Sequence, residues 1–527
     1  MLLNQGTAKN MPPLPQIELP YLKGERYLWK MPATNRSAIV ELSSAYSLSQ
    51  PIVEVLCNRG YDTSAKLQDF LLTLEEDHVF DPRLLKGAII AAERILRAIE
   101  KKEKILIAGD YDVDGVTSSS VMLIAMLPLG AQINYFLPHR ERDGYGLSVK
   151  TVQRAAQNGY SLIITVDNGI SAHESAAMAA SLGVDLIITD HHRPHGTLPQ
   201  ALAIVNPNQD DCTYPYKHFA GVGVAFKLMG LVYEMLGKEL PEKVYELVAM
   251  GTVADVVPLT SENRFWVREG LRKINKSHSF SFATLAANNN VQKSRISSLD
   301  IGFMIAPQIN ALGRLDDSRE AVKFSVSSNQ EDIERVGKIL KLMNEERKKI
   351  ERAIYDEVEQ AILQGHINLS ENKIILASHH NWQPGVIGLV AGKLMHQFGR
   401  PTILMHRDPK SGIVKGSCRS IPEFDIFHAL TACKDLLLSF GGHTCAAGLK
   451  LKEENVPELQ ERLEVLISAQ VSAEDLQPKI TVDASLELPD MTSKLMHDLA
   501  QLEPFGNKNP QPLFFIKNVT QLKNRSF

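Results

Sequence analysis

The segment GDYDVDG carries three aspartates on alternate positions, Asp110, Asp112 and Asp114, directly after the apolar run KILIA. In an extended chain, side chains two residues apart point to the same side, so we expect the three carboxylates to face the same space. Carboxylates crowded in this way are stable only when a cation lies among them or when their pKa is shifted. The stretch therefore predicts a metal site.

A calcium-binding EF-hand loop is the first alternative for the pattern Asp-x-Asp-x-Asp-Gly. That loop needs a glutamate at its twelfth position and a helix before it. Here the twelfth position is Val121, and the preceding residues have the pattern of a strand. A second alternative, in which the aspartates cap a helix or form a turn, accounts for one or two of them but not for three.

Acidic or histidine residues follow three further apolar runs, each of which we predict to be a strand. Because ligands bind at the carboxyl ends of the strands in open α/β sheets, we expect these side chains to meet the first group at one edge. A lone histidine in such a place is more often a structural residue than a ligand, but four converging strand ends favour a ligand cluster. The residues are Asp167 in LIITVDNGI, Asp190, His191 and His192 in LIITDHHRPHG, and Asp255 in AMGTVADVVPL.

The chemistry of these ligands favours Mn²⁺ or Mg²⁺. Five or six carboxylates with one imidazole suit these ions better than structural zinc, which prefers cysteine and histidine. The carboxylates are too many for one ion, and two ions that share a carboxylate would screen them from one another. Such a pair activates a bridging water for the hydrolysis of a phosphate ester or anhydride.

The predicted strands alternate with amphipathic helices and are apolar on both faces, which indicates a doubly wound parallel α/β sheet. Residues 329–364 contain no proline and one glycine, and their apolar spacing predicts a single helix of about 50 Å. We interpret it as a rod between two domains; a helix packed on one domain is the alternative. The chain then divides into an N-terminal arm (1–35), a catalytic domain (36–325), the connecting helix (326–365), a smaller α/β domain (366–470) and a C-terminal segment (471–527).

The composition is that of a soluble globular protein, with 527 residues of which 44% are hydrophobic and 22% charged. No segment approaches about 20 uninterrupted apolar residues, so we expect no membrane span. Five scattered cysteines without a CxxC pair favour reduced thiols in the cytoplasm. The net charge of −4 is weak evidence against a nucleic-acid partner, because metal ions would neutralise an acidic site.

The motifs GDYDVDG, VDNG, TDHH and GTVADVVPL resemble, in order, the four acidic motifs of the DHH phosphoesterases. PHRERDGYGLS, INALGRL, GVIGLVAGKL, GSCRS and GGHTCAAG are similar to further motifs of the family's single-strand DNA exonucleases. The resemblance covers roughly residues 45–520. It implies a parallel-sheet DHH domain, joined by a long helix to a smaller α/β DHHA1 domain, with a partial OB-like segment at the C-terminus.

The resemblance also implies the roles of the acidic residues. The two ions, Mn²⁺ or Mg²⁺, would be held by Asp110, Asp112, Asp114, Asp167, His191 and Asp255, with Asp167 as the bridging ligand. Asp190 would orient an imidazole and His192 would lie near the scissile phosphate. The implied catalytic residues are thus Asp112, Asp114, Asp167, Asp190, His191, His192 and Asp255.

Phosphate recognition requires cationic and hydroxyl groups around the metals. The family motifs imply that Arg140, Tyr145 and Arg314 contact the DNA backbone. Ser417, Arg419 and His443 would come from the second domain, across a cleft that admits one strand and excludes a duplex. A surface salt bridge is the usual role of a single arginine, but the surrounding glycines favour close approach to phosphate.

The resemblance implies a 5′→3′ exonuclease of single-stranded DNA that acts in repair and recombination. It also implies a cytoplasmic monomer, with a single-strand DNA-binding protein and a helicase as candidate partners. The alternatives are a DHH phosphodiesterase for short oligonucleotides or cyclic dinucleotides and, more remotely, a non-catalytic replication scaffold. Short substrates fit poorly with the long chain, and the intact set of metal ligands disfavours the scaffold.

The sequence departs from the family pattern at two positions and in its C-terminal segment. Gln308 stands where an arginine is usual, which implies that one phosphate contact is weaker, and Gln383 stands where a histidine is common. The segment EPFGNKNPQPLFFI resembles the entry into an OB barrel, but too few residues follow for five strands. We therefore expect a partial OB-like segment.

Overall fold

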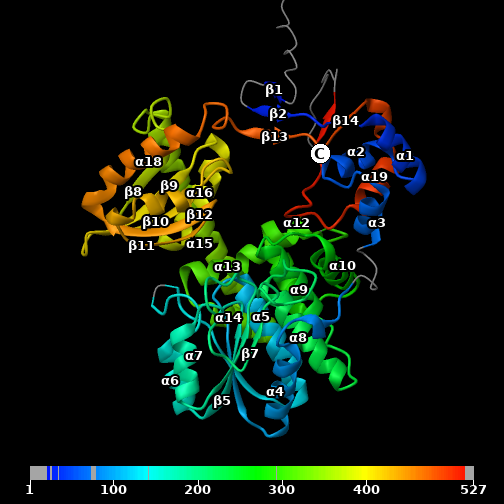
Figure 1. Cartoon of the computed structure of the whole chain (residues 1–527), viewed down its shortest axis with the longest axis vertical. Coiled ribbons are helices and arrows are strands. Elements are labelled where there is room, and N and C mark those ends of the chain that lie inside the picture. Colours follow the sequence, from blue (N-terminus) through cyan, green and yellow to red (C-terminus); the bar gives the residue numbers. More distant parts are fainter. Residues whose placement is uncertain are drawn as a thin grey trace, which may run out of the picture. The chain divides into compact units, whose positions relative to one another are not determined.

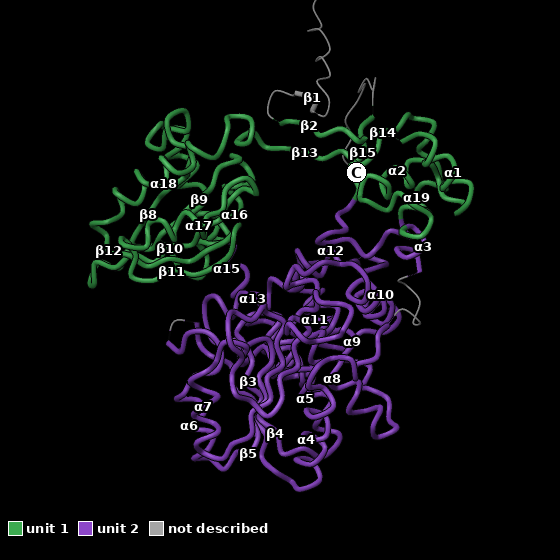
Figure 2. Tube along the Cα trace, in the orientation of Figure 1, with its two compact units in different colours: residues 1–66, 349–499, 512–527 green, residues 67–348, 500–511 purple. Residues whose placement is uncertain are grey.

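The computed structural model describes residues 21–23, 27–33, 35–72, 79–140, 142–291 and 293–516. They belong to two compact units, coloured separately in Figure 2. The larger unit comprises residues 67–348 and 500–511, and the smaller unit comprises residues 1–66, 349–499 and 512–527. Each unit is described by itself below.

The larger unit is built on a five-stranded parallel sheet with the strand order β4-β3-β5-β6-β7. Its strands are rich in isoleucine, leucine and valine, and the central ones are buried on both faces, as expected for a parallel sheet. The predicted fold class is therefore confirmed. The strands are β3 (Lys104–Ala108), β4 (Gln132–Phe136), β5 (Tyr160–Val166), β6 (Asp185–Thr189) and β7 (Ala203–Val205).

Helices cover both faces of this sheet (Figure 1). Side chains alternate along each strand, so Ile105 and Ile107 of β3 pack on one face while Leu106 and Ala108 pack on the other. The first face meets α4 (Ala88–Glu100), α5 (Val113–Met126) and α8 (Gly221–Met235). The second face meets α6 (Val149–Gln157) and α7 (His173–Ser181).

The sequence analysis was wrong about the segment AMGTVADVV, which we predicted to be a strand. Its residues 249–254 belong to α9 (Lys243–Ala254), a helix whose residues Val244, Leu247 and Met250 are buried in the core. A helix that is apolar around most of its circumference has no clear periodicity, and a short window of it cannot be told from a buried strand. Asp255 therefore follows a helix and not a strand.

The rest of the larger unit is helical and packs beside the sheet. Residues Ile301–Ile305 form one turn of π-helix between two α-helices. The elements are η2 (Pro82–Leu84), η3 (Leu127–Leu129), α10 (Ser261–Lys276), α11 (Phe280–Asn288), α12 (Ser298–Asp300), η4 (Ile301–Ile305), α13 (Ala306–Leu315) and α14 (Arg319–Val326).

A single helix, α15 (Gln330–Leu363), occupies the stretch for which the sequence predicts one long helix. Its N-terminal half buries Ile333, Val336 and Leu340 in the core of the larger unit. Further along, Ile354 and Val358 are buried as well. The division between the two units falls inside this continuous helix, after residue 348.

The smaller unit contains a second sheet of five strands, in the order β11-β12-β10-β9-β8. Strands β8 and β9 are parallel and the other neighbours are antiparallel. The strands are β8 (Ile375–His379), β9 (Thr402–Asp408), β10 (Ile413–Arg419), β11 (Leu437–His443) and β12 (Ala446–Lys452). The helical elements of this region are α16 (Pro384–Phe398), α17 (Ile426–Ala432), η5 (Lys434–Leu436), η6 (Glu453–Asn455) and α18 (Val456–Gln470).

Both ends of the chain contribute short strands to the smaller unit. The N-terminal arm includes β1 (Tyr21–Lys23) and β2 (Leu28–Lys30), and β2 pairs with β13 (Lys479–Thr481). The predicted OB-like segment supplies β13 and the parallel pair of β14 (Ala484–Leu486) and β15 (Phe514–Ile516). Residues 517–527 of that prediction lie outside the described residues. The smaller unit also contains α1 (Arg36–Tyr46), α2 (Gln50–Asn58) and η7 (Leu488–Asp490). The division between the units falls within α3 (Ser64–Leu72) and within α19 (Ser493–Gln501).

No helix within the described part of the chain combines the length and the apolar character that a membrane crossing requires.

Candidate metal centre

We predicted that the GDYDVDG segment is extended, but in the structure it turns from β3 into α5. Asp110 lies two residues beyond the end of β3, and Asp112 is the N-cap of α5, where its carboxylate accepts a hydrogen bond from the Gly115 amide at 3.1 Å. A Cβ atom on Gly115 would lie 2.4 Å from the Asp110 carbonyl oxygen, so the tight turn needs glycine there. The three aspartates therefore lie close together because of a strand-to-helix turn.

Asp114, in the first turn of α5, is held by the N-terminus of another helix. Its two carboxylate oxygens accept hydrogen bonds from the backbone amides of Gly221 at 2.5 Å and Val222 at 2.8 Å, which begin α8. The amides at a helix N-terminus have no partner within the helix, so they suit an anionic acceptor. This contact fixes the Asp114 carboxylate while its side chain is only 1% exposed.

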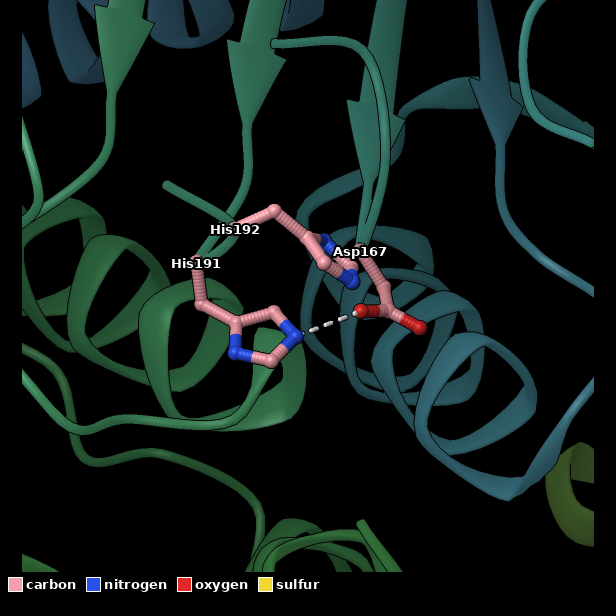
Figure 3. Close-up of side chains that lie close together, drawn as sticks. All are labelled: Asp167, His191 and His192. Carbon is pink, nitrogen blue, oxygen red and sulfur yellow. Dashed lines mark ion pairs between the residues drawn. The ribbon is translucent and has the colours of Figure 1, made fainter. Parts of the chain in front are cut away.

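Asp167 follows β5 and is close to the imidazole of His191, as Figure 3 shows. Its backbone has a φ of 61°, a left-handed conformation that few residues other than glycine, asparagine and aspartate adopt. The Asp167 Oδ1 atom lies 3.1 Å from His191 Nε2. The Tyr145 hydroxyl donates a hydrogen bond to the Asp167 carbonyl oxygen at 3.1 Å and helps to hold this backbone.

His191 Nε2 points at three carboxylates and has no hydrogen-bond partner among the described residues. Besides Asp167, Asp114 Oδ2 lies at 3.8 Å and Asp255 Oδ2 at 3.7 Å from this nitrogen. The Asp110 Oδ1 atom is likewise buried without a hydrogen-bond partner in the described structure. Buried polar atoms are rarely left without partners, and a bound cation beside each of these two atoms would supply one.

Three groups of side chains could each hold a metal ion, because their ligand atoms lie within 4.8 Å of one another. Asp167 belongs both to the group with Asp110 and Asp112 and to the group with His191 and His192. A ligand that bridges two ions is expected to lie in such a position. The groups are Asp110, Asp112 and Asp167; Asp114, His191 and Asp255; and Asp167, His191 and His192.

The electrostatics of the cluster fit divalent cations. Burial raises the pKa of Asp114 to about 7, and the neighbouring Asp112 adds to the effect. Burial, with repulsion from nearby carboxylates, also raises the pKa values of Asp110, Asp167 and Asp255 well above the usual range. Burial and mutual repulsion thus outweigh the nearby cations, such as Arg140 beside Asp110. The carboxylate and imidazole donors match the preferences of Mn²⁺ and Mg²⁺.

Asp190 holds the two histidines in place. Its carboxylate accepts hydrogen bonds from the backbone amides of Ile170, His191 and His192, and it lies 2.7 Å from His192 Nδ1. Burial acts to raise the pKa of Asp190, but the His192 contact and the imidazole charges outweigh it, and the pKa is lowered. Asp190 is therefore an anion that positions neighbouring groups.

The two imidazoles have opposite character. Burial and the neighbouring His192 lower the pKa of His191 to about 4, so His191 is neutral, as a metal ligand must be. Burial acts to lower the pKa of His192 as well, but the contact with Asp190 outweighs it and the pKa is raised. The side chain of His192 is 45% exposed, so it can reach a ligand in solution.

Of the predicted phosphate-binding residues, those of the larger unit lie around the cluster. The Arg140 guanidinium carbon lies 4.1 Å from the ring centroid of Tyr111, and Arg140 Nε donates to the Gly313 carbonyl at 3.3 Å. A Cβ atom on Gly313 would lie 2.2 Å from the Tyr111 carbonyl oxygen, so the NALGRL motif packs directly on the GDYDVDG turn. This places Arg314 next to the same turn.

The sequence analysis missed several residues that support the centre. Tyr111 stacks with Arg140 and contacts the Tyr145 ring edge-to-face. Asn168, fully buried, donates to the carbonyls of Ala108 and Val166 and so ties the ends of β3 and β5 together. The side chains of Asn206 and Asn208 donate to the carbonyls of His192 and His191. The sequence does offer a signal for these asparagines, because VDNG and VNPNQ place them directly after apolar runs.

Ser417, Arg419 and His443 belong to the smaller unit, at one end of its sheet. Arg419 of β10 and His443 of β11 are both register partners of Ala446 on β12, so their side chains share one face. Arg419 donates to Ser417 Oγ at 3.2 Å. Gly388 of α16 leaves room for this pair, since a Cβ atom there would lie 2.7 Å from Ser417 Oγ.

The structure places Gln308 in the interior of the larger unit. Its side chain is fully buried and bonded within the protein: the amide nitrogen donates to the carbonyls of Leu285 and Met304, and the amide oxygen accepts from Asn288. The residue is part of the packing of α13 against α11. Gln383 is the N-cap residue of α16.

Comparison with known proteins agrees with this architecture. The sequence profile of the DHH family, N-terminal domain, matches residues 104–252; that of the DHHA1 domain matches residues 371–469; and that of the RecJ OB domain matches residues 482–527. The first of these matches contains the motifs around Asp110, Asp167 and His191.

Two curated relatives are described as single-stranded-DNA-specific exonuclease RecJ. The protein of Bacillus subtilis is 39% identical over 492 residues, which are 93% of this chain and 62% of that protein. The protein of Escherichia coli is 37% identical over 452 residues, which are 82% of this chain and 78% of that protein. The chain thus spans less than two thirds of the Bacillus relative.

The crystal structure of RecJ from Thermus thermophilus in complex with Mn²⁺ has the same fold. It matches with a TM-score of 0.78 and 29% sequence identity, over 93% of this chain and 69% of that one. The identity to the Escherichia coli protein over more than two thirds of its length, the three domain matches and this structural likeness lead to one conclusion: the chain belongs to the RecJ family of DHH proteins.

Proposed function

We propose that this protein is a metal-dependent exonuclease that hydrolyses phosphodiester bonds of single-stranded DNA. The observation that carries the proposal is the set of buried carboxylates around His191 Nε2, a nitrogen that has no hydrogen-bond partner in the described structure. The names of the relatives, which specify single-stranded DNA, support the choice of substrate.

Two ions would be held at the overlapping ligand groups. Asp110, Asp112 and Asp167 would hold one, and Asp114, Asp167, His191 and Asp255 the other. Bound there, Mn²⁺ or Mg²⁺ supplies an activated water and stabilises the charge that develops on the phosphate oxygens. The manganese in the Thermus relative supports this choice of metal.

The protein's own groups orient the reaction. Asp190 fixes the His191 and His192 backbone, and the raised pKa of His192 lets this half-exposed imidazole donate a hydrogen bond to the scissile phosphate. Tyr145 holds the Asp167 backbone, and Arg140 and Arg314 provide positive charge beside the turn. Ser417, Arg419 and His443 provide further phosphate contacts from the DHHA1 sheet.

The finer parts of the proposal follow from family membership. They are 5′→3′ polarity, a role in repair and recombination, a cytoplasmic monomer, and a single-strand DNA-binding protein and a helicase as partners. For the division of the chain we propose an arm (1–35), a DHH domain (36–325), a connecting helix (326–365), a DHHA1 domain (366–470) and an OB-like segment (471–527). Limited proteolysis tests these boundaries.

The experiment that tests the function offers three labelled substrates: a single-stranded oligomer, its duplex and a dinucleotide, each with Mn²⁺ or with EDTA. We expect hydrolysis of the single strand from its 5′ end with Mn²⁺ and none with EDTA. Asp114→Ala should abolish it, because Asp114 is buried among the metal ligands. Asp210→Ala, an exposed aspartate of the larger unit, is the matched control and should behave like the unaltered chain.

Two outcomes would contradict the proposal. Activity confined to the dinucleotide would assign the chain to the phosphodiesterases of short substrates. Activity that survives both EDTA and Asp114→Ala would refute the metal mechanism.

A further inference from the structure

A basic pocket lies in the larger unit, beside α10. It has a volume of about 430 Å³ and is lined by one face of α10, by the segment that carries Arg295, and by Glu503 and Pro504. Four cations line it, while Glu503 is its single lining carboxylate among the described residues. The cations are Arg268, Arg272, Lys276 and Arg295.

The walls of this pocket are fixed by specific contacts. The Asn275 side chain donates to the carbonyls of Leu271 and Ile296, and its oxygen accepts from the Ile296 amide at 2.7 Å. This ties the segment of Arg295 to α10. Arg295 in turn lies 3.1 Å from the Glu503 carboxylate, which joins the third wall to the second. The pocket is therefore a built part of the fold.

The charge of the pocket is only partly compensated. Arg272 pairs with Glu269 at 2.8 Å and Arg295 with Glu503, but no carboxylate among the described residues pairs with Arg268 or Lys276. Burial, helped by Arg295, lowers the pKa of Arg268 and outweighs the opposing charges of Glu269 and Glu503. Two of the four cations, Arg268 and Lys276, thus have no ion-pair partner among the described residues.

We propose that this pocket binds the phosphate backbone of a single-stranded nucleic acid whose end occupies the metal centre. The inference rests on the proposed function and extends it to a remote part of the substrate. Arg268, Arg272 and Lys276 follow one another at intervals of four residues, about 6 Å along a helix, which is comparable to the step between phosphates in an extended strand. Leu271 and Pro504 line the same pocket and offer apolar contact to sugars and bases.

The pocket is connected to the metal centre through the chain. Asp255 is followed by the loop that leads into α10, and the amide of Leu259 in this loop donates to the Asn507 carbonyl at 2.8 Å. The basic face then runs along α10, and Lys276 is about 22 Å from the start of that helix at 1.5 Å per residue. A strand that follows α10 over this length would extend several nucleotides before it reaches Lys276.

The test measures binding of labelled oligothymidylates of about 30 and about 4 nucleotides by fluorescence anisotropy, in EDTA and over a range of salt. Arg268→Gln/Lys276→Gln removes the two cations that have no ion pair, so no carboxylate loses its partner. The matched control is Lys338→Gln/Lys341→Gln, which removes two exposed lysines of α15 that form no ion pair in the described structure. Circular dichroism checks that both variants fold.

We expect the pocket variant to bind the long strand about tenfold more weakly, and the slope of log affinity against log salt to fall by about 1.4, or 0.7 for each lost contact. Its affinity for the short strand should not change, and the control should match the unaltered chain. Unchanged binding of the long strand would refute the proposal. Equal losses for the long strand and for thymidine monophosphate would assign the pocket to free nucleotides instead.

If the pocket variant bound polyglutamate more weakly than the unaltered chain but bound the long strand equally well, the pocket would be assigned to an acidic protein. This result would also overturn the proposal. Failure of the unaltered chain to hydrolyse DNA with Mn²⁺ would refute the proposed function separately. The binding measurement in EDTA does not depend on hydrolysis, so the two failures can be told apart.

Discussion

Gly221 is the residue at which the smallest change should disturb the metal centre most. It begins α8, and its amide donates to the Asp114 carboxylate. A Cβ atom at this position would lie 2.6 Å from Asp167 Cβ and 2.9 Å from Asp167 Oδ1. The first distance is about 0.9 Å shorter than a favourable carbon–carbon contact, so either α8 or Asp167 must move by nearly that amount.

Gly221→Ala should therefore lower the turnover of single-stranded DNA about 100-fold, because a displacement of about 1 Å at a catalytic group has an effect of that size. The free energy of unfolding should fall by about 1–3 kcal/mol, as for other overpacked sites. Mn²⁺ affinity, measured by calorimetry, should fall as well, since Asp114 and Asp167 are both displaced. The calorimetric measurement does not require activity.

Gly230→Ala is the matched control on the same helix. Its Cβ atom would meet nothing closer than Leu240 at 3.9 Å, so the variant should be active and more stable by about 0.5–1 kcal/mol. If Gly221→Ala bound Mn²⁺ and turned over DNA within about twofold of this control, the proposed packing of α8 against the metal ligands would be wrong.

Three further outcomes are expected. Without metal the pKa of the folded-state Asp114 is raised to about 7, so the folded chain loses stability as the pH rises from the pKa of the unfolded-state carboxyl toward 7. In EDTA, thermal melting should therefore show lower stability at about pH 8 than at about pH 5, and Mn²⁺ should reverse this trend. A flat profile in EDTA would contradict this reasoning. Lys227→Met should destabilise the chain by about 3–5 kcal/mol in urea denaturation, because the fully buried Glu262 carboxylate loses the Lys227 ammonium, which lies 3.0 Å away. The double variant Lys227→Met/Glu262→Leu should recover much of the lost stability. Gln308→Arg should cost about 3 kcal/mol or more without strengthening DNA binding, since the side chain is buried among amides; tighter binding would show that it reaches the phosphate.

The parallel sheet could be predicted because its central strands are short apolar runs bounded by turn residues, and because polar side chains stand directly after them. Asp110, Asp167 and Asp190 come together for the reason that the pattern suggests: adjacent parallel strands end at one edge. Asp255 could be named as a member of the cluster, but its element was misjudged, since a buried helix and a buried strand have the same composition over nine residues.

Other contacts of the site could not be predicted from the types of side chain in the sequence. Asp114 is held by backbone amides of Gly221 and Val222, and any residue provides a backbone amide. Gln308 occupies a family position, but its role depends on three amide contacts that come from α11 and from the preceding π-helical turn. Such contacts arise from the packing of segments that are distant or irregular, which periodicity does not report.

The left-handed backbone of Asp167 has a consequence for how such a protein can change over generations. Of the residues other than glycine, asparagine is the one that shares the tolerance of aspartate for this conformation, and a single base change converts an aspartate codon into an asparagine codon. The exchange would remove a charge from a crowded set of carboxylates while leaving the backbone in place. A chain that keeps its fold but lacks one of the proposed metal ligands is thus one base change away.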